Sequence, residues 1–219
     1  MNRDHYIIIN NKEIDYPYYQ THVYKETGKE FTHLKGATRR VNRPIRRIVL
    51  HHDATLSASA CYDILKRRNL GTHFSIDNDG RVWQFADPHN LTTWASSQFN
   101  GTSINIDISN AVLTQYKDSY DPKREEGNRL IHGRRVTGLL PYPIQIRSSA
   151  MLIAQLLGHY DLEPVVLDRY SVNMDLSPSD TKYTVIGHYH FARNKIDPFG
   201  VNWKELEEYI HEYKNRIFI

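Results

Sequence analysis

Two short apolar runs, far apart in the chain, both lead into histidine. Residues 45–51 predict a buried strand that ends in His51 and is followed at once by His52. Residues 185–187 lead in the same way into His188. The ends of two strands can meet at one point when both belong to one sheet. The histidines therefore favour a fold in which these two strands bring their ends together.

Further strand patterns alternate with helix patterns along the chain. Residues 73–85 predict two strands joined by a turn at 78–80, and residues 103–110 predict another strand. Helices are expected over 57–68, over 144–160, and after Asn202, where Glu205 completes a capping box. This alternation predicts an α/β domain with a mixed central β-sheet flanked by helices.

The chain divides into a small N-terminal extension, residues 1–43, and a main domain, residues 44–219. Within the extension, residues 6–16 predict a hairpin that turns at Asn10-Asn11, because asparagine tolerates the left-handed conformation of such turns. Residues 18–42 are polar and suit an extended lead wrapped over the main domain. Residues 116–142 show little periodicity and are expected to form a long excursion near the site or over the surface.

Composition excludes several classes of protein without identifying a partner. A formal charge of +3 is too small to identify a binding partner. A basic pI is compatible with an anionic polymer as the partner. The single cysteine, Cys61, excludes an intrachain disulfide and a zinc site built on paired cysteines. The apolar run 7–9 is too short for a signal peptide, and no segment is long enough to span a bilayer. We therefore expect synthesis in the cytoplasm without a signal peptide.

Histidine and carboxylate residues are the chemical groups that stand out. The sequence has no His-Glu-x-x-His metal motif, phosphate loop, Gly-x-Ser-x-Gly elbow or dinucleotide fingerprint. A hydrolytic zinc ion needs three nitrogen or oxygen ligands from the protein and one open position. Asp197, in the loop before Pro198, can supply the third ligand beside His51 and His188.

Four segments resemble the superfamily of N-acetylmuramoyl-L-alanine amidases and peptidoglycan recognition proteins, which includes phage endolysins and wall-recycling amidases. They are residues 48–55 (IVLHHDAT), 72–84 (THFSIDNDGRVWQ), 100–108 (NGTSINIDI) and 187–198 (GHYHFARNKIDP). The order and spacing of the segments also agree. The resemblance covers about residues 45–203 and implies the amidase fold over the main domain.

The resemblance assigns roles to particular residues. His51, His188 and Asp197 fall on the family's zinc ligands, so Zn²⁺ is the expected cofactor and residues 44–219 the catalytic domain. Lys195 is expected to stabilise the negative charge that develops on the carbonyl oxygen. Asp107 stands where wall-recycling members carry a catalytic glutamate.

Departures from the family pattern leave the proton carrier open. Asp107 is shorter than glutamate, and it could equally be a strand-end carboxylate bonded to its neighbours. Thr72 stands where other members use a catalytic tyrosine, and Trp94 is followed by alanine where a histidine is common. His52, His73 or the metal alone could then take the role of base. His190 is expected on the same side of its strand as His188, so that it supports or replaces a ligand. Support from His52 and His73 is expected as well.

The function expected from this resemblance is hydrolysis of the amide bond between N-acetylmuramic acid and L-alanine in peptidoglycan, by a phage-type lysin. The substrate would be peptidoglycan or a muropeptide, with a holin or virion partner and with neither nucleic acid nor membrane as a ligand. The enzyme would act on the cell wall after release or as part of a virion. The alternatives are a recycling amidase, a non-catalytic peptidoglycan-binding module of the same fold, and a virion-associated structural protein.

Overall fold

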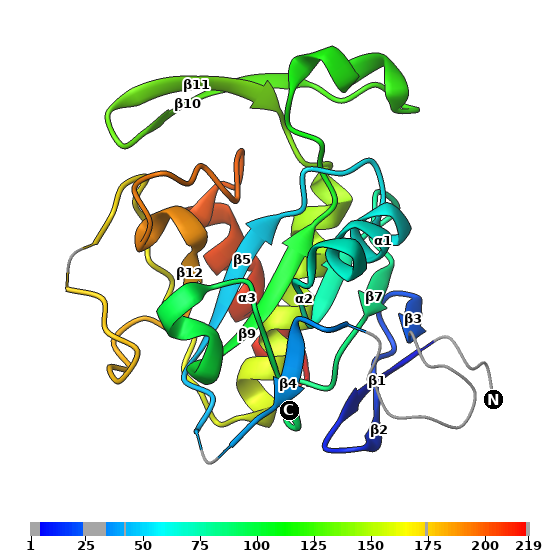
Figure 1. Cartoon of the computed structure of the whole chain (residues 1–219), viewed down its shortest axis with the longest axis vertical. Coiled ribbons are helices and arrows are strands. Elements are labelled where there is room, and N and C mark those ends of the chain that lie inside the picture. The colour runs from blue at the N-terminus through cyan, green and yellow to red at the C-terminus, as the bar shows by residue number, and fades with distance from the viewer. Residues whose placement is uncertain (1–4, 24–33, 42, 174, 218–219) are drawn as a thin grey trace.

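A mixed six-stranded sheet forms the centre of the molecule (Figure 1). The computed structural model describes residues 5–23, 34–41, 43–173 and 175–217. The strand order is β12-β5-β9-β6-β7-β3, and every neighbouring pair is parallel except β6 and β7. The strands are β3 (Thr21–Val23), β5 (Arg47–His52), β6 (Phe74–Ile76), β7 (Val82–Gln84), β9 (Ser103–Ile108) and β12 (Val185–Gly187). The strand ends carrying His51 and His188 are thus adjacent, and the predicted sheet is confirmed.

Three α-helices cover the sheet, with α1 on the near side in Figure 1 and α2 and α3 on the far side. Their bounds are α1 (Ala58–Arg68), α2 (Pro143–His159) and α3 (Trp203–Ile217). Ile48 and Leu50 of β5 enter the core that α2 and α3 close, whereas Val49 enters a cluster on the opposite face. This two-sided burial confirms the predicted α/β layering. It also explains why β5 is apolar at consecutive positions.

The last helix begins as its sequence predicts. The Asn202 side chain accepts a hydrogen bond from the backbone N–H of Glu205 at 3.5 Å, as an N-cap residue does. Trp203, Leu206 and Ile210 are fully buried in the main core cluster, so the apolar stripe of α3 faces the core, where it packs against α2.

The N-terminal hairpin is confirmed, and it is built into the main core. β1 (Tyr6–Ile9) pairs with β2 (Lys12–Asp15), and Asn10 and Asn11 have φ angles of 55° and 60°. Ile7, Ile9 and Tyr16 join the core cluster under the central sheet. The domain boundary between residues 43 and 44 therefore stays a prediction from the sequence. The hairpin before this boundary packs closely against the main domain.

The segment that follows the hairpin contributes two short strands. β3 extends the central sheet beside β7, while β4 (Ala37–Arg39) pairs with β8 (Leu91–Thr93). The predicted extended lead thus contains paired strands in its described parts. Residues 24–33 and 42, which belong to the same lead, lie outside the described residues.

Residues 116–142 contain a hairpin that their weak periodicity did not predict. β10 (Glu126–Ile131) pairs with β11 (Arg134–Leu139), after a 3-10 helix η2 (Thr114–Ser119). His132 and Gly133 turn the chain with φ angles of 52° and 76°. Such turns usually carry Asn-Gly or Asp-Gly. Because histidine stands in the place of asparagine or aspartate here, the sequence did not indicate a turn. The hairpin stands beyond the end of the sheet, on the side where β5 ends (Figure 1).

Candidate metal centre

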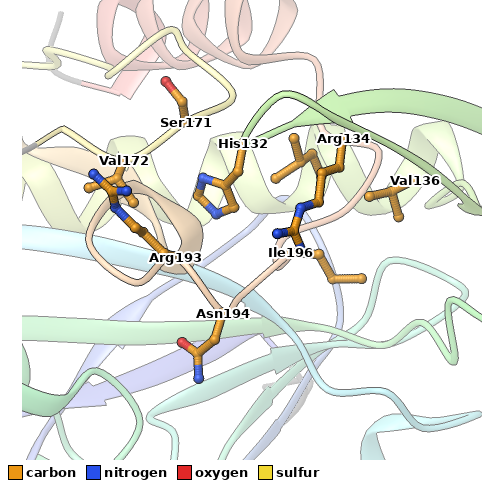
Figure 2. Close-up of a pocket in the computed structure, with 9 residues that line it drawn as sticks. His132, Arg134, Val136, Ser171, Val172, Arg193, Asn194 and Ile196 are labelled. Carbon is orange, nitrogen blue, oxygen red and sulfur yellow. The ribbon is translucent and has the colours of Figure 1, made fainter.

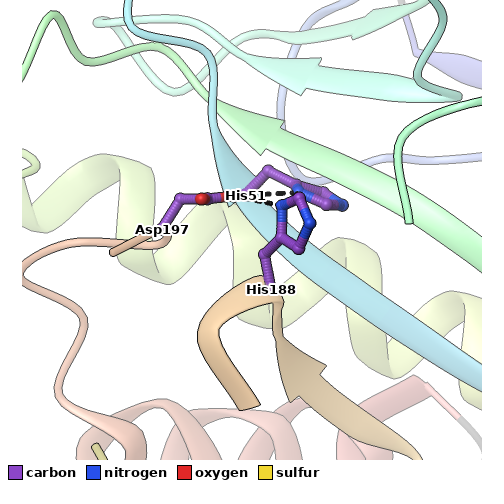
Figure 3. A group of neighbouring side chains, drawn as sticks. All are labelled: His51, His188 and Asp197. Atoms are coloured by element: carbon purple, nitrogen blue, oxygen red, sulfur yellow. Dashed lines mark hydrogen bonds and ion pairs between the residues drawn. The ribbon is translucent and has the colours of Figure 1, made fainter. Parts of the chain in front are cut away.

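Three side chains converge where β5 and β12 end (Figure 3). His51 is the second-last residue of β5. His188 is the first residue of the 3-10 helix η3 (His188–His190), which follows β12, and Asp197 lies in the next loop. His51 Nδ1 lies 3.1 Å from His188 Nδ1 and 3.0 Å from Asp197 Oδ2, and His188 Nδ1 lies 2.9 Å from the same oxygen. All three residues are at least nine-tenths buried.

The geometry and chemistry of this triangle fit a metal ion. Tetrahedral zinc with ligands at about 2.0–2.1 Å separates its ligand atoms by roughly 3.3 Å, close to the observed spacing. Two imidazole nitrogens and a carboxylate oxygen are all metal-binding donors, and buried together they favour a positive charge between them. The group of His51, His188 and Asp197 can therefore hold a metal ion.

The pKa shifts of the three residues differ in direction because each balances burial against its neighbours. Burial raises the pKa of Asp197, but hydrogen bonds to His188 and His51 hold it well below its usual range. For His51, burial lowers the pKa, and the hydrogen bond to Asp197 with the nearby Asp107 carboxylate raises it, so that the net shift is upward. The pKa of His188 is lowered because burial and the neighbouring His51 outweigh its hydrogen bond to Asp197.

Asn105 and Ser96 orient His51, and neither was predicted as a site residue. His51 Nε2 lies 3.2 Å from Asn105 Oδ1 and 3.2 Å from Ser96 Oγ. The Asn105 amide donates to Thr93 Oγ1 at 2.8 Å, which turns its oxygen toward the histidine. A proton held on Nε2 leaves the Nδ1 lone pair free for a metal. The sequence could have indicated Asn105, because it lies two residues before Asp107 and therefore on the same face of β9.

Close backbone packing brings the two loop ligands together. The Tyr189 N–H donates to the Asp197 carbonyl at 3.0 Å. A Cβ atom on Gly187 would lie 2.6 Å from Pro198 and 2.9 Å from Trp203, so only glycine fits before His188. The Gly-His pair of the sequence motif thus has a steric reason.

His190 lies in a 3-10 turn and not on the strand that the sequence pattern predicts. The strand ends at Gly187, and the 3-10 turn of η3 replaces the expected alternation of sides. His190 Nδ1 accepts the Gly187 N–H at 2.8 Å, and its Nε2 donates to the Arg169 carbonyl. His190 therefore braces the backbone next to His188.

His73 and His52 also bond to backbone groups. His73 Nδ1 accepts the Asn105 N–H at 2.9 Å while its Nε2 lies 3.1 Å from the Leu91 carbonyl, and burial lowers its pKa to about 3. His52 Nδ1 accepts the Phe199 N–H at 3.0 Å, and burial lowers its pKa to about 4. Both imidazoles are thus neutral, and of the two only His52 lines the pocket beside the triangle.

A pocket of about 260 Å³ opens at the triangle and contains both predicted catalytic residues. Asp107 pairs with His51 across the parallel strands and is almost fully buried. Burial raises the pKa of Asp107, against the lowering influence of His51 and Thr72. Lys195, from the loop before Pro198, lines the same pocket. A carboxyl group and an ammonium group thus face one cavity with the three candidate ligands.

The residues that depart from the family pattern lie close to the same site. Thr72 is fully buried, and its hydroxyl donates to the Asn105 carbonyl at 3.0 Å. Trp94 is half-exposed at the rim of the pocket, with Ala95 next to it. Asp53 lines the pocket as well, and burial raises its pKa to about 7 although Thr55, Asn110 and Ser109 donate hydrogen bonds to it.

Comparison with known protein families matches residues 41–200 to the N-acetylmuramoyl-L-alanine amidases. The chain belongs to this family. The match covers most of the chain and includes all three candidate ligands, and it confirms the resemblance drawn from the four motifs. No curated protein matches the chain.

Solved amidase structures share the fold at low sequence identity. The Staphylococcus aureus hydrolase AmiA in complex with its ligand is 16% identical, with a TM-score of 0.55 over 89% of this chain and 83% of AmiA. LysC, an N-acetylmuramoyl-L-alanine amidase from Clostridium intestinale, is 15% identical, with a TM-score of 0.54 over 88% and 97% of the two chains.

A third structure, AmiD from E. coli, is solved with anhydro-N-acetylmuramic acid-L-Ala-D-γ-Glu-L-Lys as substrate. It is 15% identical, with a TM-score of 0.52 over 93% of this chain. This chain spans 65% of the length of AmiD. All three comparisons support the amidase fold.

Proposed function

We propose that this chain is a zinc-dependent amidase that cleaves the bond between N-acetylmuramic acid and the first L-alanine of the peptidoglycan stem peptide. Family membership supports the reaction class. The observation that carries the proposal is the buried triangle of His51, His188 and Asp197, whose donor atoms lie within hydrogen-bond distance of one another. The substrate of AmiD contains this bond, which supports the same substrate class here.

In this proposal His51, His188 and Asp197 hold the zinc ion. Zinc bound in this way supplies Lewis-acid chemistry, which acidifies water and polarises an amide carbonyl. Lys195 presents its ammonium group to the carbonyl oxygen as negative charge develops there. Asp107 carries the proton from the attacking water to the leaving amine, directly or through a second water.

His52 is the other candidate for the proton carrier, since it lines the pocket and its imidazole is neutral. His73 has both ring nitrogens engaged by backbone groups, which disfavours it for this role. We keep Asp107 as the proposed residue because its carboxyl group lies beside His51 in the strand register.

The catalytic domain in this proposal comprises residues 44–219, and residues 1–43 are an extension whose described parts pack against it. A phage-type lysin that meets the wall after release, aided by a holin or carried on a virion, is the biological setting we propose. No described helix has the length and apolar character needed to cross a membrane.

Metal content and peptide release from purified peptidoglycan test the proposal together. We expect one zinc per chain, and release of stem peptides with a free L-alanine amine that stops with a chelator and returns with added Zn²⁺. Zinc without release would favour a peptidoglycan-binding module of the same fold. A chain without zinc would contradict the proposed ligand set.

A further inference from the structure

A second pocket, of about 460 Å³, lies between the tip of the β10–β11 hairpin and the loop that carries Lys195 and Asp197 (Figure 2). His132 and Arg134 line it from the hairpin, and Arg193 and Asn194 line it from the loop. None of the functions proposed above uses this pocket.

The loop between the two cavities is a shared wall. Arg193, Asn194 and Ile196 line the second pocket, whereas Lys195 and Asp197 line the pocket at the metal centre. A ligand that passes over this one loop therefore reaches from the proposed zinc site into the second pocket.

The charge of the second pocket is positive and not neutralised. Among the described residues that line it, none is acidic. The guanidinium groups of Arg134 and Arg193 make no hydrogen bond or ion pair with the part of the chain that the structure describes. Either guanidinium group, beside apolar walls, attracts a carboxylate strongly, because guanidinium binds a carboxylate through two parallel hydrogen bonds. Ile131, Val136 and Ile196 supply those walls.

His132, in the same pocket, bonds to backbone carbonyl groups. Its Nε2 donates to the Lys195 carbonyl at 3.0 Å, and its backbone N–H donates to the Tyr170 carbonyl at 2.9 Å. These bonds attach the hairpin tip to the loop and hold the two walls at a set distance. The arginines, in contrast, have their guanidinium groups free for a ligand.

The hairpin itself separates pocket-facing residues from solvent-facing ones. Ile131 pairs with Arg134 and lies on the pocket side, while Leu130 pairs with Arg135 on the outer side and is 66% exposed. Arg135 therefore has the same chemistry as Arg134, one residue away, with its side chain directed outward.

We propose that this arginine pocket binds a carboxylate of the stem peptide, beyond the first L-alanine, while the scissile amide lies at the metal centre. The inference rests on the proposed function and specifies how the substrate is held. It assigns Arg134 and Arg193 to substrate binding and predicts a preference for stem peptides with free carboxylates over amidated ones.

The test compares two soluble muropeptides, one with the stem L-Ala-D-γ-Glu-L-Lys and one with its carboxylates beyond L-alanine amidated. For the double variant Arg134→Gln/Arg193→Gln we expect KM for the free-carboxylate substrate to rise about tenfold or more, since charged hydrogen bonds are lost, with kcat unchanged. KM for the amidated substrate should change little. Arg135→Gln is the matched control and should behave as the wild type on both.

An equal effect on both substrates, or none on either, overturns the inference. An effect seen only on walls that retain a phosphate-bearing polymer, and absent with soluble muropeptides, assigns the pocket to phosphate and overturns it as well. Turnover of the amidated muropeptide by the wild type tests the proposed function separately. If neither substrate is turned over, calorimetric titration of the free-carboxylate muropeptide into wild type and double variant still tests the pocket.

Discussion

The two halves of the metal centre are built differently. His51 and Asp107 belong to neighbouring strands of the central sheet, where register and the Asn105 amide determine where each side chain points. His188 and Asp197 belong to a 3-10 turn and a loop, which are held by backbone contacts and by the fit of Gly187. Strand register fixes the direction of the sheet residues before any side-chain contact is made, whereas the loop residues depend on backbone contacts between separate segments.

Removing a proposed ligand from either half should have the largest effect. We expect His51→Ala and Asp197→Ala to lose bound zinc, and activity to fall at least about ten-thousandfold, because two ligands do not hold a hydrolytic zinc. Metal analysis and muropeptide hydrolysis measure both losses. His211→Ala, on the exposed side of α3, is the control. If one half tolerated the loss while the other did not, the ligand set would need revision.

Asp107→Asn tests the sheet half without touching the metal. We expect zinc to stay bound and kcat to fall about a thousandfold, the loss typical of a missing proton carrier. Rapid-quench or steady-state kinetics with a soluble muropeptide gives the value. Unchanged kcat would move the role to His52 or to the metal alone, and Asp107 would then be a structural carboxylate.

Lys195→Ala is the corresponding change in the loop half. Zinc content should match the wild type, and kcat should fall about a hundredfold, because one group that stabilises the developing oxyanion is gone. Lys182→Ala, an exposed lysine in another loop, provides the comparison. A variant with wild-type kcat would exclude the proposed role of Lys195.

Asn105→Ala should have the smallest effect, on metal affinity rather than on the ligands themselves. Loss of the bond that orients His51 is expected to weaken zinc binding about tenfold. Competition with a chelator measures the affinity, and Asn128→Ala on the exposed face of β10 is the matched control. Equal affinities in the two variants would mean that the strand alone orients His51.

Sequence patterns determined the elements whose information is local. The apolar runs of β5 and β9, the Asn-Asp-Gly turn between β6 and β7, and the capped start of α3 all form where the pattern predicts them. Spacing along one strand or helix reports which face is buried, and the named residues carry that spacing. The four motifs also identified the family, because their order and residue types agree with it.

Only the tertiary structure decided which side chains meet. The pattern could not show that β12 ends at Gly187, so it placed His190 on a strand where the structure has a 3-10 turn. The contact of Asn105 with His51, and the pocket between the β10–β11 hairpin and the Lys195 loop, join residues far apart in the chain. Such contacts depend on how strands are ordered and how a loop packs, and neither is encoded in any single stretch of sequence.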